Sequence, residues 1–290
     1  MRLTQKIGLA IAVASTMTAA NAARDTIQIA GSSTVLPFAS IVAEDCNKAG
    51  VNKIQEIKIG YDGIVFASNS NKAAFKLKPY HVFAALAEKM PAKGKLIANP
   101  YTRWNQIDKA LPNEPITLVI PASNHGTREV FQEKMVTAGC EAYTYFKNLD
   151  KDAREKACST FRKDGRVVEI AGDYTETLAR LKTSPSAVGV FGLSFYDQNR
   201  DRLRVATVNG VTPSEATVIS GKYPVSRPLY FYVKGEHLQA IKGLPQYVEF
   251  FVSPKVSGPN SKLVNAGLIP LSSSERSKIL ADFKAGKTVK

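Results

Sequence analysis

The chain has 290 residues, of which 44% are hydrophobic, 22% charged and 9% aromatic. This composition excludes an intrinsically disordered chain, a collagen and a small disulfide-dense domain, and the length allows one large domain or two lobes. Lysine and arginine outnumber aspartate and glutamate by 39 to 25, which gives a formal net charge of +14. Such a charge indicates anionic partners, either small anions, nucleic acids or acidic surfaces, but carries no information about the fold.

The first 22 residues have the pattern of a secretory signal peptide. Arg2 and Lys6 flank a short polar start, an apolar run extends from Ile7 to Ala14, and Ala20-Asn21-Ala22 fits the small-x-small cleavage rule. The apolar run is much shorter than the roughly 20 residues that span a bilayer, which disfavours the alternatives of a membrane anchor or a buried first helix. We therefore expect residues 1–22 to be removed, leaving a soluble, exported protein with a net charge of +12.

Strand-like runs alternate with helical patterns along the rest of the chain. Expected strands cover residues 26–31, 54–59, 64–67, 116–120, 167–170, 188–191, 203–208 and 229–233. Expected helices cover residues 36–49, 82–89, 104–110, 127–138, 150–163, 175–182, 246–251 and 273–285. A turn at Tyr61-Asp62-Gly63 is expected to separate the second and third strands. The alternation predicts an α/β protein with open, mostly parallel sheets flanked by helices, and any two lobes would be joined by crossing strands because no flexible linker is present.

Three cysteines fit an oxidising compartment. Cys140 and Cys158 are 18 positions apart, across a segment that has the pattern of helix, turn and helix. We expect these two residues to form a disulfide, the alternative being two buried thiols. Cys46 is left as an odd cysteine.

Two segments share one design, in which a strand is followed by a turn of small and hydroxylated residues and then by a helix start. A helix N-terminus presents unpaired N–H groups and a partial positive charge, so it receives anions readily. The alternative is that the hydroxyl groups are ordinary N-caps. Two such turns in one basic chain favour an anion site, to which Arg128 could direct two N–H groups. The candidate residues are Ser32, Ser33, Thr34, His125, Gly126, Thr127 and Arg128.

Other kinds of function have weaker support in the sequence. A hydrolase could use Ser123 or Thr127 as nucleophile and His125 as base, but no Gly-x-Ser-x-Gly motif is present and residues two apart on a turn seldom point together. The three histidines are scattered without metal-ligand spacing, so we expect no metal, no cofactor and no enzymatic activity. Lysines interleaved with aromatic residues between Lys53 and Tyr80 suit a solvated basic face better than a nucleic-acid groove. His125 could donate to a ligand or bond to the loop backbone.

The strings IPASNHGTREVF at Ile120–Phe131 and GSSTVLP at Gly31–Pro37 resemble the ligand loops of periplasmic phosphate-binding proteins, the receptors of Pst-type phosphate ABC importers. Further similar strings follow in family order over nearly all of residues 26–290, namely EIKIGYDGIV, VEIAGDYTETLARL, VGVFGLSFYDQN and YPVSRPLYFYVK. The resemblance implies a two-lobed periplasmic binding protein of type II-like fold, with lobe 1 at residues 24–63 plus 226–290 and lobe 2 at residues 64–225. It also implies a monomer in the periplasm that binds inorganic phosphate between the lobes and delivers it to the membrane permease of an ABC importer.

This sequence departs from the family pattern after its first expected helix. Roughly 30 residues, the size of one βαβ unit, are missing there, and in the family they carry a second glycine-rich loop and a strand ending in aspartate. The usual partner of a cysteine near this point lies in the same missing segment, which accounts for the odd Cys46. His125 stands where the family usually has serine. The alternative function is therefore a truncated paralogue that acts as a surface or interaction protein, with weak or no phosphate binding.

Overall fold

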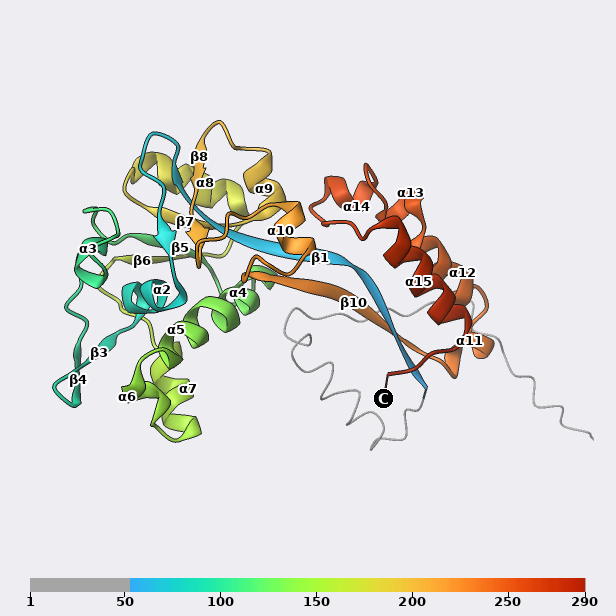
Figure 1. Ribbon diagram of the computed structural model, residues 1–290, viewed down its shortest axis with the longest axis horizontal. Coiled ribbons are helices and arrows are strands. Elements are labelled where there is room, and N and C mark those ends of the chain that lie inside the picture. Colours follow the sequence, from blue (N-terminus) through green and yellow to red (C-terminus); the bar gives the residue numbers. More distant parts are fainter. Residues whose placement is uncertain (1–52, 290) are drawn as a thin grey trace, which may run out of the picture.

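The computed structural model describes residues 53–289. The signal peptide, the first expected strand and helix, Cys46 and the loop residues Ser32, Ser33 and Thr34 therefore lie outside the described residues. Within the described range the protein has two parts of unequal size, and the long strands β1 (Ile54–Asn69) and β10 (Ser226–Lys234) extend from one part into the other (Figure 1).

The central sheet has the strand order β10-β1-β7-β5-β6, with β8 also paired to β1. The shorter strands are β5 (Leu118–Pro121), β6 (Val167–Ile170), β7 (Val188–Gly192) and β8 (Leu203–Val205). Strand β5 is parallel to both β6 and β7, whereas β1 is antiparallel to β7, β8 and β10. Helices follow the parallel strands, so the expected α/β fold class is confirmed.

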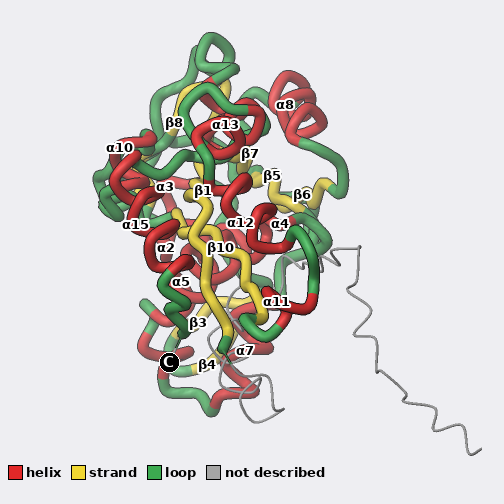
Figure 2. Tube along the Cα trace, turned by 90° about the vertical axis from the view of Figure 1, so that its right-hand side faces the viewer, coloured by secondary structure: helices red, strands yellow, loops and turns green. Residues whose placement is uncertain are grey.

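The expected turn at Tyr61-Asp62-Gly63 is wrong, because β1 continues through it. These residues pair with β10 from Tyr61 opposite Pro228 to Gly63 opposite Ser226, and the two strands lie side by side in Figure 2. The Asp-Gly sequence has a local preference for turns, but long-range pairing overrides such preferences. A Cβ atom at Gly63 would lie 2.9 Å from Val218 Cγ2, so glycine is needed here for close packing and not for a turn.

Helices cover the strands and build the outer layers. They are α2 (Pro79–Leu86), α3 (Trp104–Ile107), α4 (Gly126–Phe131), α5 (Ala138–Glu141), α6 (Thr144–Lys147), α7 (Lys151–Ser159), α8 (Tyr174–Thr183), α9 (Leu193–Asp197), α10 (Glu215–Ile219), α11 (His237–Ala240), α12 (Leu244–Val252), α13 (Pro254–Ser257), α14 (Lys262–Asn265) and α15 (Ser273–Lys284). A π-helical segment, Gln132–Thr137, joins α4 to α5, so the expected helix at 127–138 is continuous but not regular throughout. Two short pairings complete the described range, β2 (Lys76–Leu77) with β9 (Thr207–Val208) and β3 (Lys89–Ala92) with β4 (Lys95–Ala98). None of the helices between residues 53 and 289 combines the length and the apolar character needed to cross a bilayer.

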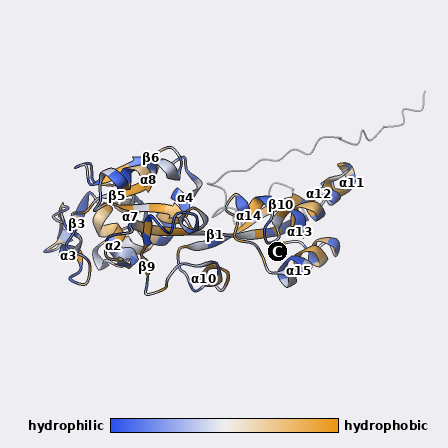
Figure 3. Ribbon diagram, turned by 90° about the horizontal axis from the view of Figure 1, so that it is seen from above, coloured by the Kyte–Doolittle hydropathy of each residue, from blue (hydrophilic) through white to orange (hydrophobic). Residues whose placement is uncertain are grey.

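The described residues contain two hydrophobic cores. The larger one surrounds β5, β7 and the second half of β1, and the strands at its centre are coloured as hydrophobic in Figure 3. The smaller one joins Ile57 and Val233, from the first half of β1 and from β10, to Val248 of α12 and Phe283 of α15. The two long strands thus contribute to both cores.

Cys140 in α5 and Cys158 in α7 form a disulfide, as the sequence predicts. Both cysteines are buried, at 0% and 3% exposure, within the larger core. The bond therefore ties α7 to α5, which continues the helical segment that starts with α4.

Glu275 in the first turn of α15 links this helix to β1. Its carboxylate accepts hydrogen bonds from Tyr61 Oη at 2.8 Å and Lys58 Nζ at 3.3 Å, and it forms a capping box with Ser272. Partial burial by itself would raise the pKa of Glu275, but the hydrogen bonds from Tyr61, Ser272 and Lys58 lower it to about 2. The carboxylate therefore contributes stability above its ordinary pKa of 4.5, and this contribution is lost as the pH falls towards 2.

We expect Glu275→Gln to reduce the free energy of unfolding at pH 7 by about 1 kcal/mol, because solvent screening limits the worth of a partly exposed charge. Glutamine keeps an acceptor for the capping box, so the variant removes mainly the charge. Denaturant titrations of both proteins between pH 7 and pH 3 would test this. The difference should shrink as the pH falls, and a difference that is independent of pH would contradict the assignment.

Candidate functional site

The candidate site lies at one edge of the central sheet. Because β7, β5 and β6 are parallel, their carboxyl ends meet at this edge, and each is followed by a helix that starts there: α9, α4 and α8. Ligands of open α/β sheets bind outside the carboxyl ends of the strands. Strand β1 passes the same edge, since Ile64 pairs with Gly192 at the end of β7.

The predicted loop between β5 and α4 is fixed by its own backbone. The N–H of Ala122 donates to the carbonyl of Ile170 at 2.9 Å, which holds the loop against the end of β6. His125 is the N-cap of α4, and its Nδ1 accepts a hydrogen bond from the N–H of Thr127 at 3.3 Å. This assigns the proton of a neutral ring to Nε2, the nitrogen that remains able to donate. The hydrogen bond to the loop backbone that the sequence analysis considered for His125 is present, and donation to a ligand stays a prediction.

Thr127 is buried, and its hydroxyl is hydrogen-bonded to the hydroxyl of Tyr174 in the first turn of α8. The Tyr174 ring also packs on His125, with centroids 5.2 Å apart, and against Phe191 and Phe195. Burial raises the pKa of Tyr174 to about 12, so the phenol is neutral and can donate a hydrogen bond at neutral pH. Thr127 therefore points towards a phenol and not towards the imidazole that a hydrolytic mechanism would require.

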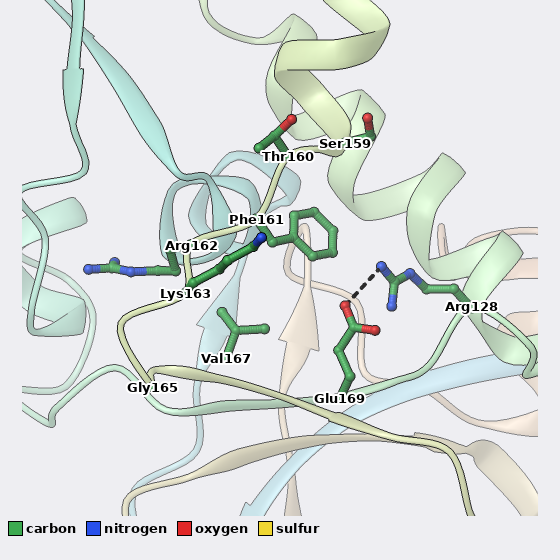
Figure 4. Close-up of a pocket in the computed structure, with 9 residues that line it drawn as sticks. All are labelled: Arg128, Ser159, Thr160, Phe161, Arg162, Lys163, Gly165, Val167 and Glu169. Carbon is green, nitrogen blue, oxygen red and sulfur yellow. Dashed lines mark hydrogen bonds and ion pairs between the residues drawn. The ribbon is translucent and has the colours of Figure 1, made fainter.

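Arg128 turns away from the other predicted residues. Its Nη1 donates to the carbonyl of Pro121 at 2.6 Å, its Nη2 lies 3.5 Å from Glu169 Oε1, and its guanidinium stacks 5.0 Å from the Phe161 ring (Figure 4). Arg128, Phe161 and Glu169 border a pocket of about 560 Å³ between the end of α7 and the start of β6. None of the other predicted site residues that the structure describes lines this pocket.

The arginine that contacts the first turn of α4 is Arg227 of β10. Its Nη2 donates to the carbonyl of Gly126 at 3.3 Å, and its Nη1 donates to Glu129 Oε2 at 2.9 Å. Its Nε lies 3.9 Å from Asp62 Oδ2, across the β1–β10 pairing. Burial raises the pKa of Asp62 above the usual aspartate range, although the Arg227 guanidinium opposes this shift.

Sequence reasoning did not identify four residues of this cluster as functional: Asp62, Glu129, Tyr174 and Arg227. All four lie in strings that carry the family resemblance, and this was the signal that could have found them. Among residues 53–289 no group of three or more histidine, cysteine, aspartate or glutamate side chains is arranged to hold a metal ion. The geometry consists of a capped helix start flanked by hydroxyl groups and an arginine, which suits recognition of a small oxyanion.

The sequence of this chain is similar to those of known proteins. The profile of the PBP superfamily domain matches residues 43–255. The phosphate-binding protein PstS of Staphylococcus haemolyticus (strain JCSC1435) is 25% identical over 209 residues, which cover 70% of this chain and 55% of that protein, so the chain spans about half the length of the curated relatives it matches.

Several solved structures resemble this one. A possible phosphate binding protein from Planctomyces limnophilus DSM 3776 has a TM-score of 0.60 at 18% identity, covering 85% of this chain and 77% of that one. A putative phosphate ABC transporter substrate-binding protein from Clostridium perfringens, solved with bound phosphate, has a TM-score of 0.50 at 18% identity, covering 83% and 85%. These likenesses confirm the two-lobed α/β fold.

Proposed function

The chain belongs to the PBP superfamily, and from that membership we propose that it is a periplasmic solute-binding protein that captures inorganic phosphate for an ABC importer. The proposal rests on one observation above all: the start of α4, with Gly126 and Thr127, lies at the carboxyl edge of the parallel strands beside an arginine. A helix start combined with a nearby guanidinium is suited to a tetrahedral oxyanion. The similarity to the phosphate-binding protein PstS and to a putative phosphate ABC transporter substrate-binding protein with bound phosphate supports the same ligand.

We assign residues 24–63 plus 226–290 to lobe 1 and residues 64–225 to lobe 2. The switch of β1 from pairing with β10 to pairing with β7, between Gly63 and Ile64, supports a boundary there. Ser32, Ser33 and Thr34 would hold the anion from lobe 1, and His125, Gly126 and Thr127 from lobe 2. The signal peptide at 1–22, the periplasmic location, the monomeric state and the permease partner belong to the same proposal.

Arg128 completes the proposed set only if its side chain rotates. Its guanidinium now contacts Pro121, Glu169 and Phe161, so a bound anion would have to compete with these groups. Its exposed fraction of 15% is low enough for an ion pair there to matter. We therefore assign Arg128 a secondary place in the proposal.

We expect calorimetric titration of phosphate into the protein to give heat, and Thr127→Val to weaken binding at least tenfold. The variant removes a hydroxyl next to the helix start, and a hydrogen bond to a charged group is worth about 1.5–3 kcal/mol, or roughly one to two decades in affinity. Thr183→Val, which removes a hydroxyl bonded only to Arg180 at the far end of α8, should leave the affinity unchanged. Absence of heat with millimolar phosphate would reject the transport function.

The competing function is a truncated paralogue that serves as a surface or interaction protein. The departure from the family pattern after the first expected helix is the observation that favours it. The same titration decides between the two, because this alternative requires weak or no phosphate binding.

A further inference from the structure

We propose that Arg227 is the positioning residue of the anion site, holding the α4 loop by its contacts with Gly126 and Glu129. This inference rests on the proposed function, since it concerns the same site. It adds a residue from β10 that the predicted set does not contain.

The distances show where the guanidinium is held. Its hydrogen bonds to Glu129 at 2.9 Å and to Gly126 at 3.3 Å both go to the first turn of α4. Its 3.9 Å separation from Asp62, the residue opposite it on β1, is too long for a hydrogen bond. Although Arg227 belongs to β10, its strongest contacts are therefore with the first turn of α4.

Burial makes these contacts expensive to lose. The side chains of Arg227 and Glu129 are only 15% and 16% exposed. Removing one member of such a pair leaves the other charge poorly solvated, so the loop and the strand would have to rearrange. Because the Gly126 carbonyl accepts from Arg227, the peptide planes at the start of α4 are fixed relative to β10. The N–H groups of that turn keep one direction as long as the contact exists.

The Glu129 carboxylate argues against a role based on charge alone. It pairs with the Arg227 guanidinium at 2.9 Å, so this ion pair offers no net positive charge to an anion. An arginine present only to attract phosphate would not be neutralised in this way. The hydrogen bonds to the Glu129 carboxylate and to the Gly126 carbonyl instead fix the orientation of the guanidinium, which is what positioning requires.

The proposal can be tested with a double-mutant cycle on phosphate affinity at one fixed ionic strength. Arg227→Met should weaken binding at least tenfold, and Glu129→Met about threefold to tenfold. The double variant should bind no more than about twofold more weakly than Arg227→Met, because residues that act through one another are not additive. Arg227→Lys should recover only part of the affinity, since an ammonium group cannot reproduce the fork. Arg200→Met is the matched control, because it removes an exposed arginine that pairs with Asp197 and should leave affinity unchanged.

The sign of the Glu129→Met effect separates positioning from direct ligation. If Arg227 simply contacted phosphate, removing the neighbouring carboxylate would free the guanidinium and strengthen binding. Tighter or unchanged binding by Glu129→Met, or unchanged binding by Arg227→Met, would overturn the proposal.

If the wild type does not bind phosphate, the proposed function is rejected. The positioning role of Arg227 can still be tested in that case by hydrogen exchange. Amides of residues 123–131 should exchange at least threefold faster in Glu129→Met and Arg227→Lys than in the wild type and in Arg200→Met. Exchange elsewhere should be unchanged, which would also show that the variants are folded. Equal exchange of this segment in all four proteins would reject the positioning role.

Discussion

Replacing Cys140 and Cys158 by serine should lower the free energy of unfolding by about 3 kcal/mol, because the bond closes a loop of 18 positions and restricts the unfolded chain. For a chain of this size the loss corresponds to a fall in Tm of roughly 6–12 °C. The effect should be concentrated in α7, whose hydrophobic contacts with the core are few. Thermal unfolding of the double variant and the wild type under non-reducing conditions measures it.

Thiol counting provides the control for this result. The denatured, non-reduced mature protein should contain one reactive thiol per chain, contributed by Cys46. Three thiols would contradict the bond, and none would indicate a disulfide-linked dimer through Cys46. Cys46→Ser should abolish the signal.

The central parallel strands β5 and β7 could be predicted from the sequence because they are buried on both faces. Leu118, Val119 and Ile120 are all 0% exposed, and such continuous runs are typical of buried parallel strands. The prediction of a turn at Tyr61-Asp62-Gly63 was wrong because the conformation of these residues is set by long-range pairing and not by local sequence. Their extended conformation depends on pairing with residues more than 160 positions away, and no local pattern reports this pairing.

The same distinction between local and long-range information applies to the candidate site. The segment His125–Arg128 could be placed after a strand and at the start of a helix from composition and spacing, which are local features. The direction of Arg128 was not readable, because it depends on the Pro121 carbonyl, Glu169 and Phe161. The contribution of Arg227 comes from a strand about 100 positions further along the chain, and only the sheet topology brings it to Gly126.

The contact between α5 and α2 should be the least tolerant packing site near the disulfide. A Cβ atom at Gly139 would lie 2.2 Å from the carbonyl oxygen of Pro79 and 2.8 Å from Phe83 Cβ. Helix propensity alone favours alanine over glycine by about 1 kcal/mol. The clash outweighs this gain, because the obstructing atom belongs to the backbone of another helix and cannot rotate away. Overpacking costs typically about 1–3 kcal/mol, and the fixed backbone obstacle places Gly139→Ala at the upper end of this range. After the propensity gain of about 1 kcal/mol is subtracted, the variant should lose about 2 kcal/mol.

The neighbouring Ala138 provides a control, because replacing it by glycine lowers helix propensity whereas Gly139→Ala raises it. Ala138 is exposed in the same helix, and Ala138→Gly should cost about 1 kcal/mol through propensity alone. Denaturant unfolding of both variants should therefore rank Gly139→Ala as the less stable protein, although it adds the better helix former. If Gly139→Ala were as stable as the wild type, α2 and α5 would have to be able to separate without cost. The helix after the candidate loop would then be less firmly held than this close contact indicates.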